Sequence, residues 1–332
     1  MKVTALANSN IAILKYWGKR DYQLNLPTNS SISFTMDDQL QTITTVETNE
    51  SLTRDELYIN DQPASEKETE RAIAFMDIIR KMAKTTTRAS IYSKNSFPKS
   101  AGMASSASGF AALAGAGSKA YGLELNNKEI SILARQGSGS AARSVFGGAV
   151  EWKAGTEQNG LDSYAVQLSS SEKWKHLRNV IAISSEGEKR VSSVEGMKRI
   201  PSSELFPSRL KGMKNRLKNV REAINEGNFE KMAVSIMRDS NNMHAIMLES
   251  WPPALYLSGT SFEIIQKIHD LNDSHGKQIA AYTFDAGPNA HIYTTEKFVK
   301  EVEKILTETE GVKRTIICGI GEGLRFVDNH LK

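Results

Sequence analysis

The segment 97–109, which is rich in small side chains, limits the possible folds of this chain more than any other part of its sequence. It reads Phe-Pro-Lys-Ser-Ala-Gly-Met-Ala-Ser-Ser-Ala-Ser-Gly and lies between a β-tolerant run, 89–92, and an alanine-rich stretch, 110–121. Small residues between a strand and a helix let main-chain N–H groups converge on an anion near the helix N-terminus. The spacing is not that of the common nucleotide-binding loop. The segment therefore predicts either a closely packed helix start or a phosphate-binding loop.

Strands and helices are mixed along the chain without a regular βαβ repeat, which predicts an α+β protein. The first 60 residues favour strands, and helical periodicity begins in 66–84. Because 332 residues exceed what one core usually serves, we expect two packed domains, 1–185 and 186–332. Further helices are expected over 127–136, 202–226, 228–247, 260–273 and 296–308, and further strands over 147–152, 180–184, 279–285, 290–294 and 315–318.

Composition and charge exclude several classes of protein. A hydrophobic content of 39% and a charged content of 24% are typical of a folded chain, not of a disordered one. The net charge is only +4, and the basic cluster in 211–221 has the spacing of a solvated helix face, so a nucleic-acid partner is not expected. No stretch approaches the ~20 apolar residues that cross a bilayer, and no signal peptide is recognisable. We expect a cytoplasmic protein without a membrane partner.

Neither a disulfide nor a metal site is expected. Cys318 is the only cysteine, and it lies in a strand-like run where core packing is its favoured role. The six histidines show no metal-ligand spacing, and packing or surface roles are favoured for them.

A second segment, 137–148, places two serines and an arginine on a backbone loosened by glycine. Ser138, Ser140 and Arg143 fall within six residues of one another. An arginine so placed can bind a carboxylate through two parallel hydrogen bonds. It can equally cap a main-chain carbonyl or pair with a surface acid, and at this point both interpretations stay open.

Two charged residues end apolar, strand-like runs. Lys15 closes Ile-Ala-Ile-Leu, an unusual place for a charge without a partner or ligand. The neighbouring Tyr16 and Trp17 can pack beside a substrate or fill core. Asp285 closes Ala-Tyr-Thr-Phe and enters a Gly-Pro turn, where an aspartate often only caps the turn. Buried beside Lys15, it would stay ionised and could accept a proton or orient a hydroxyl.

Taken in order, these segments resemble the diphosphomevalonate decarboxylases, a family within the superfamily of galactokinase, homoserine kinase, mevalonate kinase and phosphomevalonate kinase (GHMP kinases). The matching parts are Asn-Ile-Ala-Ile-Leu-Lys-Tyr-Trp-Gly-Lys-Arg-Asp from residue 10, Leu-Pro-Thr-Asn-Ser-Ser-Ile-Ser from 26, Ala-Ser-Ser-Ala-Ser-Gly-Phe-Ala-Ala-Leu from 104, Gly-Ser-Gly-Ser-Ala-Ala-Arg-Ser from 137, Asp-Ser-Asn-Asn-Met-His-Ala from 239 and Tyr-Thr-Phe-Asp-Ala-Gly-Pro-Asn-Ala from 282. Each is a weak signal alone, and six in order are a strong one.

The resemblance implies a GHMP-kinase-like α+β fold. Its N-terminal domain is expected to be like ribosomal protein S5 domain 2, and its C-terminal domain to be ferredoxin-like. The resemblance further implies a site between the two domains and a homodimer. In that family ATP, accompanied by Mg²⁺, phosphorylates the 3-hydroxyl of (R)-mevalonate 5-diphosphate. The new phosphate then leaves as the carboxylate is lost, giving isopentenyl diphosphate.

Residue roles follow from the resemblance by motif match. Asp285 is expected to orient or deprotonate the 3-hydroxyl, Lys15 to neutralise phosphate charge and Arg143 to hold the carboxylate, with Ser138 and Ser140 nearby. The remaining matches to the substrate and its 5-phosphate end are Tyr16, Lys19, Arg71 and Ser192, and those to the nucleotide phosphates are Asn95, Ser105 and Ser106. Lys99 and Gly102, in the same loop, are further candidates for binding the nucleotide phosphates.

The nucleotide loop departs from the family pattern at Lys99, where a small polar residue is usual. Lys99 can bind an ATP phosphate or fill the space that ATP needs. Some archaeal relatives decarboxylate mevalonate 3,5-bisphosphate without ATP, giving isopentenyl phosphate, and an altered loop beside an intact Lys15–Arg143–Asp285 set is what that variant predicts. We favour the ATP-dependent reaction and keep the ATP-independent one, which needs no cofactor, as the alternative.

Two other classes of function are less consistent with these residues. A small-molecule kinase of the superfamily would share the loop, but a related mevalonate 3-kinase lacks the lysine and the aspartate that are present here as Lys15 and Asp285. A non-catalytic binding protein would have no reason to combine these two residues with Arg143.

Overall fold

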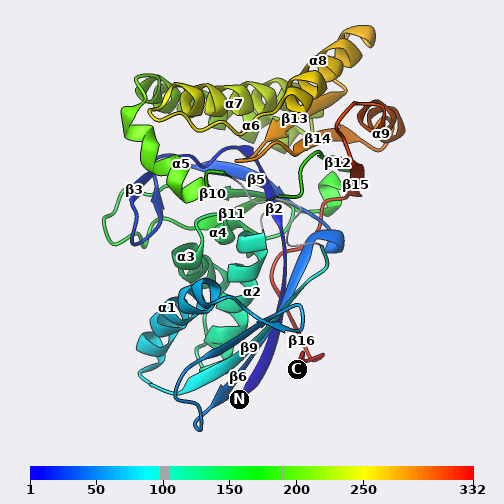
Figure 1. Ribbon diagram of the computed structural model, residues 1–332. Helices are drawn as coiled ribbons and strands as arrows, with labels where there is room; N and C mark the ends of the chain where they lie inside the picture. Colours follow the sequence, from blue (N-terminus) through cyan, green and yellow to red (C-terminus); the bar gives the residue numbers. More distant parts are fainter. Residues whose placement is uncertain (98–104, 188–189) are drawn as a thin grey trace.

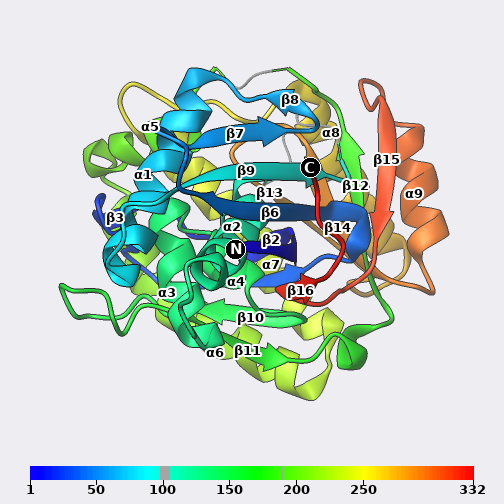
Figure 2. The ribbon, with the colours of Figure 1, turned by 90° about the horizontal axis from the view of Figure 1, so that it is seen from below.

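The computed structural model describes residues 1–97, 105–187 and 190–332. Within these residues the chain forms three larger sheets and one two-stranded sheet, with helices between and outside them (Figures 1 and 2). Helices and strands alternate irregularly through both halves of the sequence. The α+β class expected from the sequence is confirmed.

The first sheet lies at the end of the molecule that holds both chain termini (Figure 1). In spatial order its strands are β16 (Arg325–Val327), β1 (Lys2–Asn8), β6 (Gln41–Asn49), β9 (Arg88–Asn95), β7 (Glu56–Ile59) and β8 (Gln62–Pro63). Apolar side chains of α1 (Glu66–Ala83) and α2 (Ser105–Ala120) pack with those of β1, β6 and β9 in one core. Because β16 pairs with β1, the last strand of the chain returns to the sheet that the first strand began.

The other two large sheets pack against each other. One has the order β11 (Ala165–Ser169), β10 (Ala149–Trp152), β5 (Ser31–Thr35), β2 (Asn10–Leu14), and the other has β13 (Ala280–Phe284), β14 (Ala290–Thr295), β12 (Leu177–Ile183), β15 (Arg314–Cys318). Ile11 and Phe34 share a core with Tyr282 and Tyr293, and the Tyr293 hydroxyl donates to the Ile11 carbonyl over 3.1 Å. Side chains of α6 (Phe206–Glu226), α7 (Phe229–Glu249), α8 (Gly259–Ser274) and α9 (Val299–Thr307) belong to the same core.

The proposed division at residue 185 stays a prediction. Strand β12 ends two residues before it and pairs with β14 and β15 from the second half of the chain. Residues 184–187, which span this division, form neither helix nor strand.

Most expected elements are present, and the differences have physical causes. Helix α6 begins at Phe206 instead of 202, with Pro207 in its first turn, a position that tolerates proline because its missing N–H would have no helical partner. Strand β5 is buried on both faces, because Ile32 and Phe34 face the core shared with the third sheet whereas Ser31 and Ser33 face Arg143. The strands β8, β11 and β16 were not predicted, because they are short and lack clear alternation. Cys318 is fully buried, as expected.

None of the helices formed by the described residues is both long enough and apolar enough to cross a membrane.

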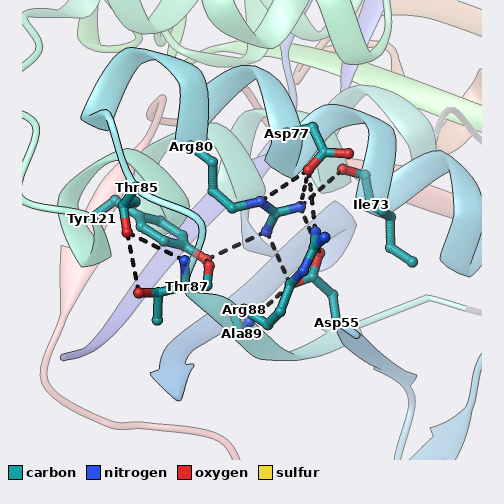
Figure 3. A network of polar contacts seen from close by, with 9 residues as sticks. All are labelled: Asp55, Ile73, Asp77, Arg80, Thr85, Thr87, Arg88, Ala89 and Tyr121. Carbon is teal, nitrogen blue, oxygen red and sulfur yellow. Dashed lines mark hydrogen bonds and ion pairs between the residues drawn. The ribbon is translucent and has the colours of Figure 1, made fainter. Parts of the chain in front are cut away.

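A buried ion network joins α1 to the first sheet (Figure 3). Arg80, only 3% exposed, donates to Asp55 over 3.0 Å and also contacts Asp77 and the Tyr121 hydroxyl. Asp55, equally buried, accepts the main-chain N–H of Ala89 over 2.8 Å. The network thus ties the end of α1 to β9 and to the residue that follows α2, and it lies among residues that line neither cavity described below.

Candidate active site

Side chains from widely separated parts of the chain line a cavity of about 340 Å³. The walls come from the end of β2, from α3 (Asn127–Gly137) and α4 (Ala141–Ser144), from α5 (Ser193–Arg199) and from the turn after β13. The cavity brings together every catalytic and substrate-binding residue predicted from the sequence: Lys15, Tyr16, Lys19, Arg71, Ser138, Ser140, Arg143, Ser192 and Asp285.

Lys15 and Asp285 form an ion pair at the cavity wall. The Lys15 Nζ atom lies 2.7 Å from Asp285 Oδ1, and the lysine side chain is 2% exposed whereas that of Asp285 is 36% exposed. Burial lowers the pKa of Lys15, while the charge and hydrogen bond of Asp285 act in the opposite direction. The carboxylate thus stays accessible from the cavity, and the ammonium is held behind it without contact with bulk water.

Arg143 is buried beneath the same cavity with hydroxyl and amide partners. Its Nε donates to Asn10 Oδ1 and Ser33 Oγ, each over 3.0 Å, and its Nη1 donates to Ser31 Oγ over 2.6 Å. Within the described residues no carboxylate forms an ion pair with Arg143 and no group accepts from its Nη2. Burial lowers the pKa of Arg143 to about 10, which leaves the guanidinium charged at neutral pH. Over the described part of the chain, Arg143 therefore neither caps a main-chain carbonyl nor pairs with a surface acid. Its Nη2 can donate to an anion bound in the cavity.

The segment between α3 and α4 brings two serines to the cavity. Ser138 is the C-cap of α3, and its hydroxyl donates to Ser106 Oγ over 3.3 Å. The carbonyl of Ser140 accepts from Asn10 over 3.0 Å, which fixes the start of α4. A Cβ at Gly139 would lie 2.8 Å from the Tyr16 ring, so glycine is required for this close approach.

The two aromatic residues after Lys15 serve both core and cavity. Tyr16 packs edge-on against Trp152 with ring centroids 4.7 Å apart, and Trp17 is 3% exposed. Both also line the cavity, where the Tyr16 hydroxyl is buried without a hydrogen-bond partner in the described residues. Tyr16 and Trp17 therefore pack in the core and also line the cavity, so the two roles considered from the sequence do not exclude each other.

Two further cations, Lys19 and Arg71, line the same cavity. Burial and the neighbouring charges of Arg71 and Lys198 lower the pKa of Lys19. Lys19 is oriented by the Asn25 side-chain oxygen, and Arg71 donates to the Gly137 carbonyl over 2.8 Å. Like charges gathered at one point repel each other, and an anion with several negative oxygens would relieve that repulsion.

A second cavity, of about 170 Å³, adjoins the first. Asn95, Ser105 and Ser106 line it, and Arg71, Ser105 and Ser106 line both cavities. Thr42 donates to the Asn95 side-chain oxygen over 2.7 Å, which leaves the Asn95 amide hydrogens for another partner. Lys99 and Gly102, predicted for the same loop, lie outside the described residues.

Several lining residues were not predicted from the sequence. These residues include Asn10, Asn25 and Met243. Ser192, which was predicted, is the N-cap of α5, and its hydroxyl accepts a hydrogen bond from the main-chain N–H of Glu195. Asn10 opens the first quoted motif, so its position was a usable signal. Asn25 carried no signal, because its role depends on a left-handed backbone (φ +53°) that lets it bond the carbonyls ending α3.

Comparison with known proteins gives one consistent result. Residues 7–165 match the model of the diphosphomevalonate decarboxylase-like N-terminal domain, and residues 179–321 match that of the mevalonate 5-diphosphate decarboxylase C-terminal domain. The diphosphomevalonate decarboxylase of Saccharomyces cerevisiae is 44% identical over 298 residues, covering 86% of this chain and 75% of the yeast protein.

Solved structures agree. The mevalonate diphosphate decarboxylase of Staphylococcus aureus superposes with a TM-score of 0.93 at 35% identity and covers 98% of both chains. A structure of MDDEF in complex with MVAPP, AMPPCP and magnesium superposes with a TM-score of 0.90 at 34% identity and covers 99% of both chains. The GHMP-kinase-like fold expected from the sequence is thereby confirmed, and the chain belongs to the diphosphomevalonate decarboxylase family.

Proposed function

We propose that this protein catalyses the ATP-dependent decarboxylation of (R)-mevalonate 5-diphosphate to isopentenyl diphosphate. One observation carries the proposal: Lys15, Arg143 and Asp285 line a single cavity together with two further cations, Lys19 and Arg71. Membership of the decarboxylase family supports the same reaction.

In the proposed first step, the 3-hydroxyl oxygen of the substrate attacks the terminal phosphorus of ATP, and ADP leaves. Asp285 accepts the hydroxyl proton, because it is the carboxylate that faces the cavity. The Lys15 ammonium, 2.7 Å from Asp285, holds that carboxylate in its ionised form and neutralises charge on the transferred phosphate.

In the proposed second step, the C3–O bond breaks and phosphate leaves with its electron pair. The bond to the carboxylate then breaks, its electrons form the carbon–carbon double bond, and CO₂ departs. Positive charge develops at C3, so the carboxylate must be held in line with the breaking bond. Arg143 is proposed to hold it through Nη2, the donor that no described residue uses.

The remaining predicted residues are proposed to bind the 5-diphosphate of the substrate and the phosphates of ATP, or to lie near the reacting carbon. Lys19 and Arg71 would hold the 5-diphosphate, with Tyr16 and Ser192 beside it and with Ser138 and Ser140 near the reacting carbon. Asn95, Ser105 and Ser106 would hold the phosphates of ATP in the adjoining cavity, together with the Lys99 and Gly102 loop.

Mg²⁺ is part of the proposal as the companion of ATP. Magnesium prefers oxygen ligands and is usually held through substrate phosphates and one or two protein oxygens. The hydroxyls of Ser105 and Ser106 line both cavities, and among the described residues no group of three or more His, Cys, Asp or Glu side chains could hold an ion by itself. These donors fit an ion carried largely by the nucleotide, where it neutralises phosphate charge.

The homodimer expected from the resemblance is proposed as well. Light scattering on the purified protein tests it, because a dimer should have twice the chain mass of 36.6 kDa.

The reaction is tested with purified protein and three incubations: mevalonate 5-diphosphate with ATP, the same substrate without ATP, and mevalonate 3,5-bisphosphate without ATP. CO₂, ADP and phosphate are measured in each. We expect all three products in the first incubation only. Gas from the bisphosphate alone would establish the ATP-independent alternative, ADP without gas would indicate a kinase, and no product in any incubation would refute the proposal.

A further inference from the structure

Helix α7 contacts both of the strands that lead to the Lys15–Asp285 pair. Lys15 follows β2 in the second sheet, Asp285 follows β13 in the third sheet, and α7 packs against both strands. The motif at 239–244 lies on this helix, and the reaction proposed above assigns it no role. Met243 lines the cavity, whereas Asp239, Ser240 and His244 do not.

Asp239 holds the main chain of Lys15. Its Oδ2 atom accepts the Lys15 N–H over 2.7 Å, and its side chain forms a 2.9 Å ion pair with Arg209 in which both partners are fully buried. Arg209 in turn donates to the Lys15 carbonyl over 3.2 Å, and Asn29 donates to the same carbonyl over 3.1 Å. The main-chain N–H and the carbonyl of Lys15 are therefore both bound, which fixes the position from which its side chain extends.

Ser240 and His244 of the same helix contact Phe284, the residue that precedes Asp285 in the sequence. The buried Ser240 Oγ accepts the Phe284 N–H over 3.0 Å. His244, one turn further on, packs edge-on against the Phe284 ring with centroids 6.1 Å apart. Adjacent residues of a helix point about 100° apart, so Asp239 and Ser240 can reach strands on two sides of one helix.

We propose that the segment 239–244 of α7 is a positioning device that sets the separation of Lys15 Nζ and Asp285 Oδ1. Asp239 and Ser240 act as positioning residues, because they bind the main chain of the pair and of its neighbour without lining the cavity. The two halves of the acid–base pair thereby take their positions from one rigid element instead of from two independent sheets. The inference rests on the proposed function in that it takes this pair to be the reacting one.

The test is Ser240→Ala, with Ser235→Ala on the same helix as the matched control. Ser235 is half-buried, and none of the hydrogen bonds in the described part of the chain involves its side chain. In Ser240→Ala the Phe284 N–H loses its acceptor. A displacement on the order of 1 Å is enough to cost about 100-fold in rate. We expect kcat to fall about 10- to 100-fold with KM within about 2-fold, and a crystal structure to show a longer Lys15–Asp285 separation. Ser235→Ala should match wild type in kcat, in KM and in the Lys15–Asp285 separation.

Ser240→Cys keeps the test decisive if the alanine variant does not fold. Cysteine has nearly the shape of serine, but its sulfur is a weak acceptor, so the same loss of kcat is expected in a folded protein. Wild-type kcat in a folded Ser240 variant, or a lowered kcat with an unchanged Lys15–Asp285 separation, would overturn the inference. Absence of activity in the wild type would refute the proposed function, and the crystallographic comparison would still decide the positioning role.

Discussion

The Nζ atom of Lys15 and the Oδ1 atom of Asp285 lie 2.7 Å apart, although 270 residues separate them in the sequence. Lys15 follows a strand of one sheet and Asp285 a strand of another, so the pair forms only when the two sheets close on their common core. The site is thus a product of the complete tertiary structure. Changes to the pair itself and changes to the fold should have separable effects.

Asp285→Asn should abolish proton acceptance while preserving shape. The amide still accepts a hydrogen bond from Lys15, but it cannot take the proton of the substrate hydroxyl. We expect kcat to fall about 10²- to 10⁴-fold, measured as CO₂ and phosphate release. The amide also removes the charge that opposes the burial-induced lowering of the Lys15 pKa. Turnover within about 2-fold of wild type would remove Asp285 from the catalytic residues.

Arg143→Lys should separate carboxylate binding from general structural support. A lysine keeps the positive charge but loses the planar set of donors, so it cannot contact Ser31, Ser33 and the substrate together. We expect kcat to fall about 10²- to 10³-fold.

Arg135→Lys is the matched control for that variant. Arg135 is equally buried, but it donates to the carbonyls of Leu24, Gly160 and Ser163, none of which lines the substrate cavity. This variant should lower the unfolding midpoint with little change in kcat. If the two variants lost kcat equally, Arg143 would have no special role in the reaction.

Residues that end an apolar run were recognisable from the sequence, whereas the partners that hold them were not. Lys15 and Asp285 were candidates because each interrupts a hydrophobic strand pattern. The roles of Ser31 and Ser33 could not be predicted, since they depend on β5 lying between β10 and β2 with its hydroxyls directed at α4. That order of strands is a non-local property.

The basic stretch over 211–221 shows the same limit. Lys211, Lys214 and Lys218 are exposed, as the helical spacing indicated. Arg221, however, forms a 2.6 Å ion pair with the buried Glu151 of β10, and Arg216 lies 3.4 Å from the buried Asp239. Charge spacing along a helix predicts its exposed face, but it does not reveal acids that other elements bring to its edge.

Asp55→Ala should destabilise the fold with little effect on the reaction. The variant leaves the buried Arg80 with only the half-exposed Asp77 as a counter-ion among the described residues, and it leaves the Ala89 N–H without an acceptor. Removing one partner of a buried pair costs about 3–5 kcal/mol, and Asp77 offsets only part of that cost. Denaturant unfolding measures the loss. Glu222→Ala, which breaks the exposed pairs of Glu222 with Lys218 of α6 and Lys231 of α7, is the control and should leave the midpoint nearly unchanged. A comparable loss in both variants would show that the network in Figure 3 has no special weight.

His244 should make the protein less stable in mild acid. Burial lowers the pKa of His244 to about 4, and the positive charge of Lys15 acts in the same direction, whereas Asp285 opposes it. An unfolded histidine has a pKa of about 6.5, so between pH 6.5 and 4 the unfolded state binds the extra proton. Stability from neutral His244 is therefore complete above about pH 6.5 and is lost as the pH falls towards 4.

Below about pH 4, protonation of His244 lowers the free energy of unfolding by about 3 kcal/mol. His244→Gln removes the titrating group, so the difference in unfolding free energy between wild type and variant should be constant above pH 7 and should shrink as the pH falls to 4. Urea unfolding at half-unit steps of pH measures this difference, and the constant value above pH 7 serves as the internal control. A difference that stays constant down to pH 4 would mean that His244 is protonated as easily in the folded chain as in the unfolded one.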